Sequence, residues 1–167
     1  MGVAGSGKTT VGELVACRLG WSFHDADDLH TAANREKMAH GIPLTDDDRQ
    51  PWLEAVRALI QRSVSRGGSA VIACSALKQS YRDQIIIDRD AVKLVYLKGS
   101  YELIAKRVTA RQRHFFDPQL LRSQFETLEE PRDELVIEVS EEAHAIADKI
   151  CAELAIRVSG GFSKEGE

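Results

Sequence analysis

The sequence has few cysteines, no long apolar run and no strong excess of charge. Its three cysteines are odd in number, widely spaced and without a CxxC pair, which excludes a disulfide framework and a cysteine-rich zinc site. The longest apolar stretches, such as 85–87, are far too short to span a bilayer, and the N-terminus does not resemble a signal peptide. We therefore expect a cytoplasmic protein with no membrane partner.

The charge balance and the length narrow the possibilities further. The net charge of −4 provides no long-range field that would attract polyanions, so we expect no nucleic-acid partner. A chain of 167 residues is long enough for one compact domain and short for two. We predict a single domain over residues 1–157, followed by a flexible tail over 158–167.

Hydrophobic periodicity predicts helices that alternate with short strands. The predicted helices are 8–19, 34–40, 51–66, 101–111 and one that begins near 140, and the predicted strands are 21–24, 70–74, 92–97 and 134–139. The strands are rich in Val, Ile and Leu on both faces, which is typical of a parallel sheet covered on both sides. The expected fold class is α/β, with three layers and a parallel sheet flanked by helices.

A phosphate-binding motif stands at the start of the chain. Residues 2–9 match GxxxxGK(S/T) in full and directly precede a predicted helix. Backbone amides of such a loop bind phosphate oxygens, the lysine reaches the β and γ phosphates, and the hydroxyl ligates magnesium. The predicted nucleotide site comprises Gly2, Val3, Ala4, Gly5, Ser6, Gly7, Lys8, Thr9 and Thr10.

The strand that normally leads into such a loop is absent from the sequence. About five apolar residues should precede the loop, yet the loop begins at Gly2. In P-loop folds this strand commonly lies in the middle of the sheet, so its loss leaves unpaired backbone groups and an apolar gap. We expect a shortened chain. The alternative is a variant that fills the gap with another segment or a partner.

Acidic and basic side chains follow the predicted strands at the edge where ligands of α/β folds bind. Asp25, Asp27 and Asp28 end the strand 21–24, where one carboxylate could hold magnesium and another could orient a substrate hydroxyl. The alternative is a solvated acidic turn. Candidate partners for a phosphoryl group or an anionic substrate, each of which could instead be a surface charge, are Arg49, Lys78, Arg82, Arg107, Arg111 and Arg113.

Several blocks of the chain resemble the gluconokinase family. Beyond the phosphate loop these are residues 23–30 (FHDADDLH), residues 42–53 (IPLTDDDRQPWL), residues 74–78 (CSALK) and residues 124–129 (QFETLE). The loop alone indicates only an NTPase, whereas the blocks together are far more specific. The resemblance covers nearly the whole chain, from residue 2 to about 150.

The resemblance implies a nucleoside-monophosphate-kinase-like fold and an activity. The expected enzyme uses MgATP to phosphorylate D-gluconate to 6-phospho-D-gluconate, and is often a homodimer. Asp27 would orient the substrate and Asp25 would belong to the magnesium shell. The remaining assignments are substrate contacts from His30, Arg49, Lys78 and Arg82, and catalytic contacts by Arg107 and Arg111 from a lid over about 107–120.

Other functions are open from the sequence. A related small-molecule kinase, such as a shikimate-type enzyme, shares the loop and the acidic strand end but uses another acceptor. A truncated, non-catalytic P-loop protein is the alternative from a different class, and the missing strand is its support. A GTPase would need an N-K-x-D type element, which the sequence does not contain.

Overall fold

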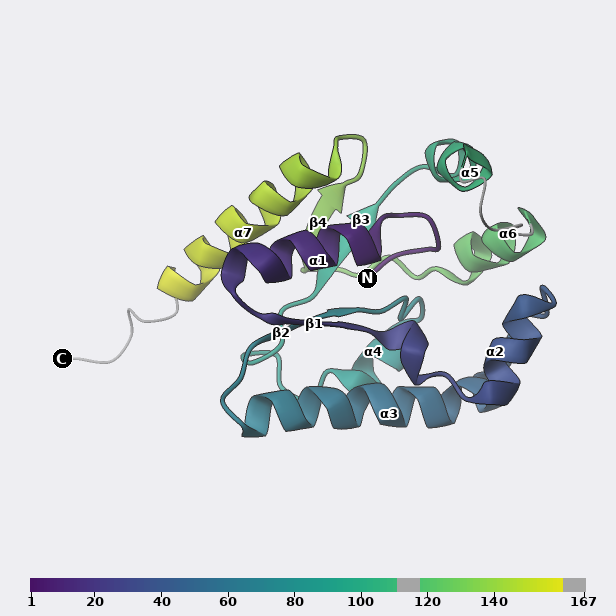
Figure 1. The fold of residues 1–167 in the computed structure, drawn as a ribbon, viewed down its shortest axis with the longest axis horizontal. Coiled ribbons are helices and arrows are strands. Elements are labelled where there is room, and N and C mark those ends of the chain that lie inside the picture. Colours follow the sequence, from purple (N-terminus) through teal and green to yellow (C-terminus); the bar gives the residue numbers. More distant parts are fainter. Residues whose placement is uncertain (111–117, 161–167) are drawn as a thin grey trace.

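The computed structural model describes residues 1–110 and 118–160. Figure 1 shows helices on both sides of short strands. The helices are α1 (Lys8–Leu19), α2 (Ala32–Ala39), α3 (Asp46–Ser65), α4 (Gln79–Ile85), α5 (Tyr101–Ala110), α6 (Pro118–Thr127) and α7 (Ala143–Gly160). The strands are β1 (Ser22–Asp25), β2 (Ala70–Ala73), β3 (Val95–Lys98) and β4 (Leu135–Glu138), and a 3-10 turn, η1, covers Ala26–Leu29.

The strands form two separate parallel pairs. β1 pairs with β2, with Ser22 opposite Ala70, and β3 pairs with β4, with Val95 opposite Leu135. Helices α1 and α7 pack against each other on one side of the strands, and α3 lies with α4 on the other side. The predicted α/β class is therefore confirmed. Among the described residues β2 and β3 are not paired with each other, which agrees with the gap expected in the middle of the sheet.

The N-terminal residues lie at this division (Figure 1). The carbonyl of Met1 accepts a hydrogen bond from the N–H of Leu97 at 2.9 Å, and the amino group of Met1 donates to the carbonyl of Val95. Met1 is therefore paired with β3 as a single residue of a parallel strand would be. From there the chain enters the loop that precedes α1.

Two apolar cores hold the helices to the divided sheet. One includes Val11 and Val15 of α1 with Leu97 of β3, and the other includes Trp52 and Val56 of α3. Burial of such side chains contributes roughly 1.5–3 kcal/mol each. No helix among residues 1–110 and 118–160 combines the length and the apolar character needed to cross a bilayer.

Helix α3 begins earlier than its sequence pattern suggested. Pro51 was predicted to open the helix, but the first residue is Asp46. The cause is a capping box, in which the Thr45 hydroxyl accepts from the N–H of Asp48 and the Asp48 carboxylate accepts from the N–H of Thr45. Pro51 sits inside the helix and withholds one main-chain donor. The short elements η1, α4 and α6 were not predicted.

Candidate active site

The phosphate loop has the backbone geometry that its glycines predict. Gly5 and Gly7 adopt φ values of 80° and 94°, in the left-handed region that side chains disfavour. Gly7 caps α1, so the loop leads directly into a helix N-terminus, where partial positive charge attracts anions. The ammonium group of Lys8 donates to the carbonyl of Val3 at 2.9 Å, which holds this side chain against the loop.

A residue far along the chain also supports the loop. The N–H of Ala4 donates to Oε1 of Gln124 on α6 at 2.7 Å. Gln124 belongs to a block that resembles the gluconokinases, but its role was not foreseen. This bond ties α6 to the nucleotide loop.

The acidic end of β1 meets the loop at Thr9. The hydroxyl of Thr9 donates to Oδ2 of Asp25 at 2.8 Å, and Oδ1 of Asp25 accepts from the N–H of Asp27 at 3.0 Å. A hollow of about 530 Å³ lies against Thr9, Asp25 and Asp28. The structure thus brings together the two residues that the sequence predicted as magnesium ligands.

This pair fits a magnesium ion of the kind that nucleotide enzymes use. Within the described ranges, no three His, Cys, Asp or Glu side chains form a metal site of their own. Mg²⁺ usually takes only one or two protein oxygens and completes its shell with water and phosphate oxygens. One hydroxyl and one carboxylate beside a phosphate loop satisfy that requirement.

Asp27 has an unusual electrostatic environment. Its pKa is raised above the ordinary 3.8, first by desolvation and then by the neighbouring charges of Asp25 and Asp28, while Lys8 opposes the shift. The side chain nevertheless has an exposed surface. An accessible carboxylate with a raised pKa, next to a phosphate-binding lysine, is suited to accept a proton from a substrate hydroxyl.

His30 is buried beside this acidic turn. Its ring stacks on Trp52 with centroids 4.8 Å apart, and the Nε1–H of Trp52 donates to the carbonyl of Ala26 at 2.7 Å. Burial lowers the pKa of His30 to about 4, with Arg49 and Arg35 adding to the effect. At neutral pH the ring is uncharged, so the structure gives it a packing role against α3.

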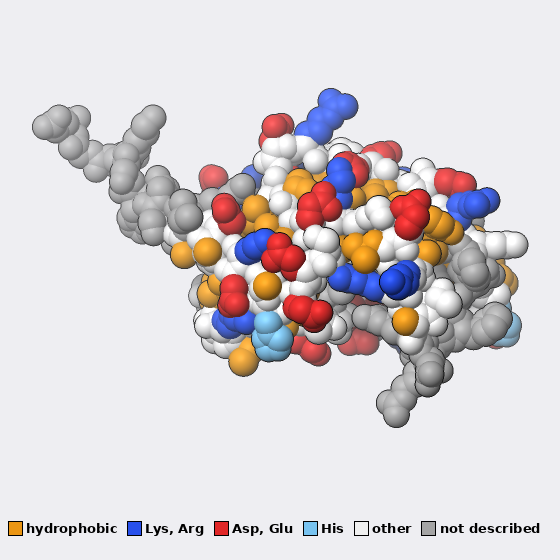
Figure 2. Space-filling view, turned by 90° about the horizontal axis from the view of Figure 1, so that it is seen from above, with side chains coloured by type: hydrophobic (Ala, Val, Ile, Leu, Met, Phe, Trp, Pro, Cys, Tyr) orange, Lys and Arg blue, Asp and Glu red, His pale blue; other side chains and the backbone are white. Residues whose placement is uncertain are grey.

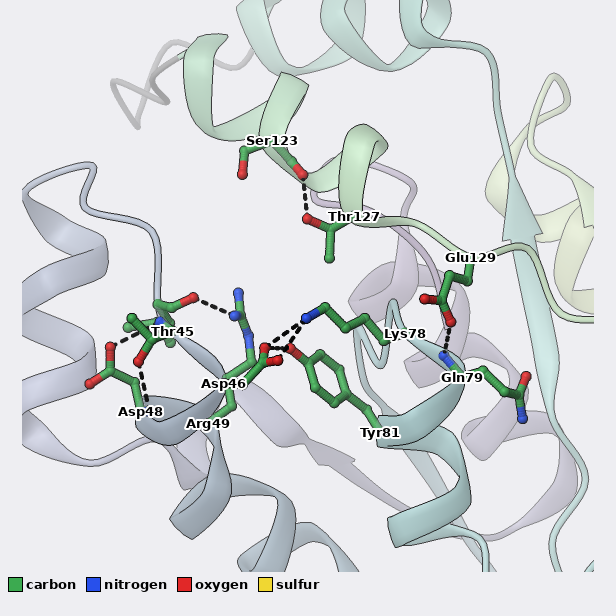
Figure 3. A network of polar contacts seen from close by, with 11 residues as sticks. Thr45, Asp46, Asp48, Arg49, Lys78, Gln79, Tyr81, Ser123, Thr127 and Glu129 are labelled. Atoms are coloured by element: carbon green, nitrogen blue, oxygen red, sulfur yellow. Dashed lines mark hydrogen bonds and ion pairs between the residues drawn. The ribbon is translucent and has the colours of Figure 1, made fainter.

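A cluster of charged side chains lies between α3 and α4 (Figure 3). Lys78 donates to both carboxylate oxygens of Asp46 at 2.8 Å, and the hydroxyl of Tyr81 donates to the same carboxylate. The Lys78 ammonium lies 5.3 Å, and the Arg49 guanidinium carbon 5.7 Å, from the centre of the Tyr81 ring. Two basic side chains that were predicted to bind the substrate, Lys78 and Arg49, therefore both lie beside the Tyr81 ring.

The chain is similar to several known proteins. The family model for shikimate kinase matches residues 4–158. The gluconokinase of Gluconobacter oxydans is 48% identical, and the match covers 86% of this chain and 82% of that protein. The chain belongs to the gluconokinase family. Its fold is accordingly that of a P-loop kinase.

Solved structures support the same assignment. A gluconokinase from Sinorhizobium meliloti 1021 is 40% identical, with a TM-score of 0.76 and coverage of 94% of both chains. An unliganded sugar kinase from Janibacter sp. HTCC2649 is 38% identical, with a TM-score of 0.86 and coverage of 93% of this chain and 92% of that one.

Two predicted site arginines of this gluconokinase-family chain are engaged elsewhere. Arg82 is only 2% exposed and donates to the carbonyls of Ala76 and Leu77, each at 3.0 Å. Arg107 donates to the carbonyl of Val139 at the end of β4. This geometry does not support the direct substrate and lid contacts predicted for them. Arg111, Arg113 and the middle of the predicted lid, residues 111–117, lie outside the described residues.

The hydrogen bonds of the Asp48 carboxylate at the start of α3 predict a pH dependence of stability. Its pKa is lowered to about 2, first by the hydrogen bond from Lys37 and then by those from Thr45. Because the folded pKa lies below the ordinary 3.8, the stabilisation is present above pH 3.8 and is lost as the pH falls towards 2. We expect Asp48→Asn to be less stable than the wild type at pH 6 and to approach it at pH 2–3. Urea unfolding at both pH values measures this, and a pH-independent difference would contradict it.

Proposed function

We propose that this protein transfers the γ-phosphoryl group of ATP to D-gluconate and releases 6-phospho-D-gluconate. The observation that carries the proposal is the hydrogen bond between Thr9 and Asp25, which joins the phosphate loop to the acidic strand end. The similarity to gluconokinases supports gluconate as the acceptor. MgATP, when bound, supplies the phosphoryl group and the charge that neutralises the leaving phosphates.

The roles of the residues follow from their chemistry. The loop from Gly2 to Thr10 would hold the phosphates of ATP, and Lys8 would contact the γ-phosphoryl group that is transferred. Thr9 and Asp25 would hold magnesium. Asp27 orients the attacking hydroxyl and takes its proton as the new O–P bond forms and the bond to the ADP oxygen breaks. Lys78 and Arg49 supply positive charge for the gluconate carboxylate.

Several finer predictions stay open within this proposal. Arg82 and His30 enter it as residues that shape the site, since both are buried, and a direct contact from Arg107 stays a prediction. The contribution of Arg111, the homodimer and the cytoplasmic location are predictions from the sequence. The face in Figure 2 carries acidic and basic side chains interspersed over the described residues.

A second acceptor has one observation in its favour, because the matching family model is described as shikimate kinase. A coupled assay for ADP release, with MgATP and either D-gluconate or shikimate, separates the two. We expect turnover with D-gluconate at least about 100-fold above that with shikimate, because a site that pairs polar groups with one acceptor discriminates strongly against another. Turnover on shikimate alone would overturn the proposal, and a folded chain silent with both would favour a non-catalytic P-loop protein.

Lys78 is expected to act mainly in acceptor binding. Lys78→Met should raise the KM for D-gluconate by about tenfold to 100-fold and leave the KM for ATP within about twofold, because a hydrogen bond to a charged group contributes roughly 1.5–3 kcal/mol. Lys98→Met is the matched control, since Lys98 pairs with Glu130 at the surface. Steady-state kinetics with each substrate varied in turn measures both values. A raised KM for ATP alone would contradict the assignment.

A further inference from the structure

The turn that carries Lys78 begins with a strained residue. Ala76 adopts a φ of 38°, in the left-handed region that residues with a side chain rarely occupy. Such a conformation persists only where surrounding contacts hold it, and it occurs most often at functional sites. Arg82 supplies two of these contacts, through the carbonyls of Ala76 and Leu77. The other contacts on this turn therefore bear on how Lys78 is presented.

Glu129 contacts the chain on both sides of Lys78. The main-chain N–H of Glu129 donates to the carbonyl of Leu77 at 2.9 Å. Its carboxylate oxygen Oε2 accepts from the N–H of Gln79 at 2.5 Å (Figure 3). One residue from a distant part of the sequence thus holds the residue before Lys78 and the residue after it.

The Glu129 carboxylate also completes the start of α4. Lys78 caps this helix, but its side chain makes no capping hydrogen bond, so the first N–H groups of the helix need another acceptor. Glu129 supplies one to Gln79, the first residue of α4. The same helix carries Tyr81, whose hydroxyl shares the Asp46 carboxylate with Lys78. The orientation of Lys78 and Tyr81 therefore depends on how Glu129 holds the turn.

The segment that carries Glu129 is also tied to the phosphate loop. Gln124 of α6 accepts from the N–H of Ala4 at 2.7 Å. Glu129 lies shortly after the end of this helix at Thr127. One short segment therefore contacts both the nucleotide loop and the turn of Lys78, and it sets how far apart the two lie.

We propose that Glu129 is a positioning residue for the acceptor. It holds the turn so that the Lys78 ammonium meets the acceptor carboxylate at a fixed distance from the phosphate loop. This inference rests on the proposed function, because it takes Lys78 to bind the acceptor. The negative charge of Glu129 would by itself repel an anionic acceptor. Removing the side chain therefore lowers the KM for the acceptor if only charge matters, and raises it if Glu129 positions Lys78.

Three substitutions of Glu129 separate reach from charge. Glu129→Ala removes the side-chain acceptor, and Glu129→Asp keeps the charge on a side chain that is one methylene shorter. Glu129→Gln keeps the reach and an acceptor oxygen but is neutral. The matched control is Glu130→Gln, since Glu130 is an exposed neighbour that pairs with Lys98. The measurements are steady-state kinetics with D-gluconate and MgATP varied in turn, and thermal unfolding of each variant.

We expect Glu129→Ala and Glu129→Asp to raise the KM for D-gluconate by about fivefold to 50-fold and to leave the KM for ATP within about twofold. The reason is that a misdirected ammonium loses much of a charge-assisted hydrogen bond. Glu129→Gln should stay within about threefold of the wild type, because it can still accept from Gln79, and Glu130→Gln should match the wild type. Each variant should unfold within about 8 °C of the wild type, as expected for the loss of one cap.

A double-mutant cycle with Lys78→Met tests whether Glu129 acts through Lys78. In that background Glu129→Ala should change the KM for D-gluconate by less than about twofold, because residues that act as one unit are not additive. Additive effects, or a lowered KM in Glu129→Ala, would overturn the inference. If Glu129→Ala does not fold, equal KM values for Glu129→Asp and Glu129→Gln would overturn it instead.

The wild type separates this inference from the proposed function. Turnover of D-gluconate by the wild type, with the same KM in Glu129→Ala, would overturn the positioning role alone. A folded wild type that is silent with D-gluconate would overturn the proposed function, and the acceptor role of Glu129 with it.

Discussion

Lys8→Ala is expected to lower kcat by at least about 10²–10³-fold and to leave the fold intact. The side chain follows the left-handed Gly7 at the start of α1, and its ammonium lies against the carbonyl of Val3. There it can meet the charge that develops on a transferring phosphoryl group. Removing one such preorganised donor typically costs this factor. Alanine also favours a helix, so α1 should form as before.

The control for this prediction is Lys149→Ala. Lys149 pairs with Glu141 near the start of α7, in an exposed ion pair. Its loss should leave turnover unchanged, since exposed pairs contribute at most about 1 kcal/mol to stability. Steady-state kinetics of ADP release, together with thermal unfolding, tests both variants. Turnover of Lys8→Ala within tenfold of the wild type would remove Lys8 from the catalytic machinery.

Local sequence signals predicted the parts of the structure that depend on neighbouring residues. Helix α1 has the predicted bounds, because its apolar residues recur at helical spacing and Gly20 ends it in the left-handed conformation. The four strands lie within about three residues of their predicted ends. The proximity of Thr9 and Asp25 could be anticipated, because the phosphate loop and the carboxyl end of a strand lie at the same edge of the sheet in α/β folds.

The parts that the sequence did not predict depend on distant contacts. Gln124 reaches Ala4 across most of the chain, and no periodic pattern records such a pairing. Arg82 was expected at an open edge, but the short helix α4 turns it inward to the carbonyls of Ala76 and Leu77. Arg107 donates to the carbonyl of Val139, a partner that the sequence did not indicate, and its lid contact stays a prediction. A basic residue near a ligand edge can serve either substrate or backbone, and only the packing decides.

The division of the sheet combines both cases. A gap in the sheet was expected from the position of the loop at Gly2, and among the described residues β2 and β3 are not paired with each other. How the fold responds could not be read, because it depends on whether the helices close over the gap. They do not: an apolar cavity lies at the gap, and beside it Met1 pairs with the edge of β3 that faces away from β4.

Asp27→Asn is expected to lower kcat by about 10²–10⁴-fold, the usual contribution of a general base. Asparagine keeps the shape of the side chain but cannot take the proton. The raised pKa of Asp27 means that folding disfavours its ionised form relative to the unfolded chain, chiefly through desolvation. The neutral variant should therefore be at least as stable as the wild type. Loss of rate without loss of stability separates a catalytic role from a structural one.

The pH dependence gives the second half of this test. A general base must be ionised, so kcat of the wild type should fall as the pH falls through the raised pKa of Asp27, which lies above the ordinary 3.8. The residual activity of Asp27→Asn should lack that fall. Asp148→Asn, an exposed acid on α7 that pairs with Arg18, is the control and should keep the wild-type profile. If Asp27→Asn retained both the rate and the acid limb, another group would have to take the proton. Asp25 is a poor substitute, because its carboxylate oxygens already accept hydrogen bonds from the Thr9 hydroxyl and from the N–H of Asp27.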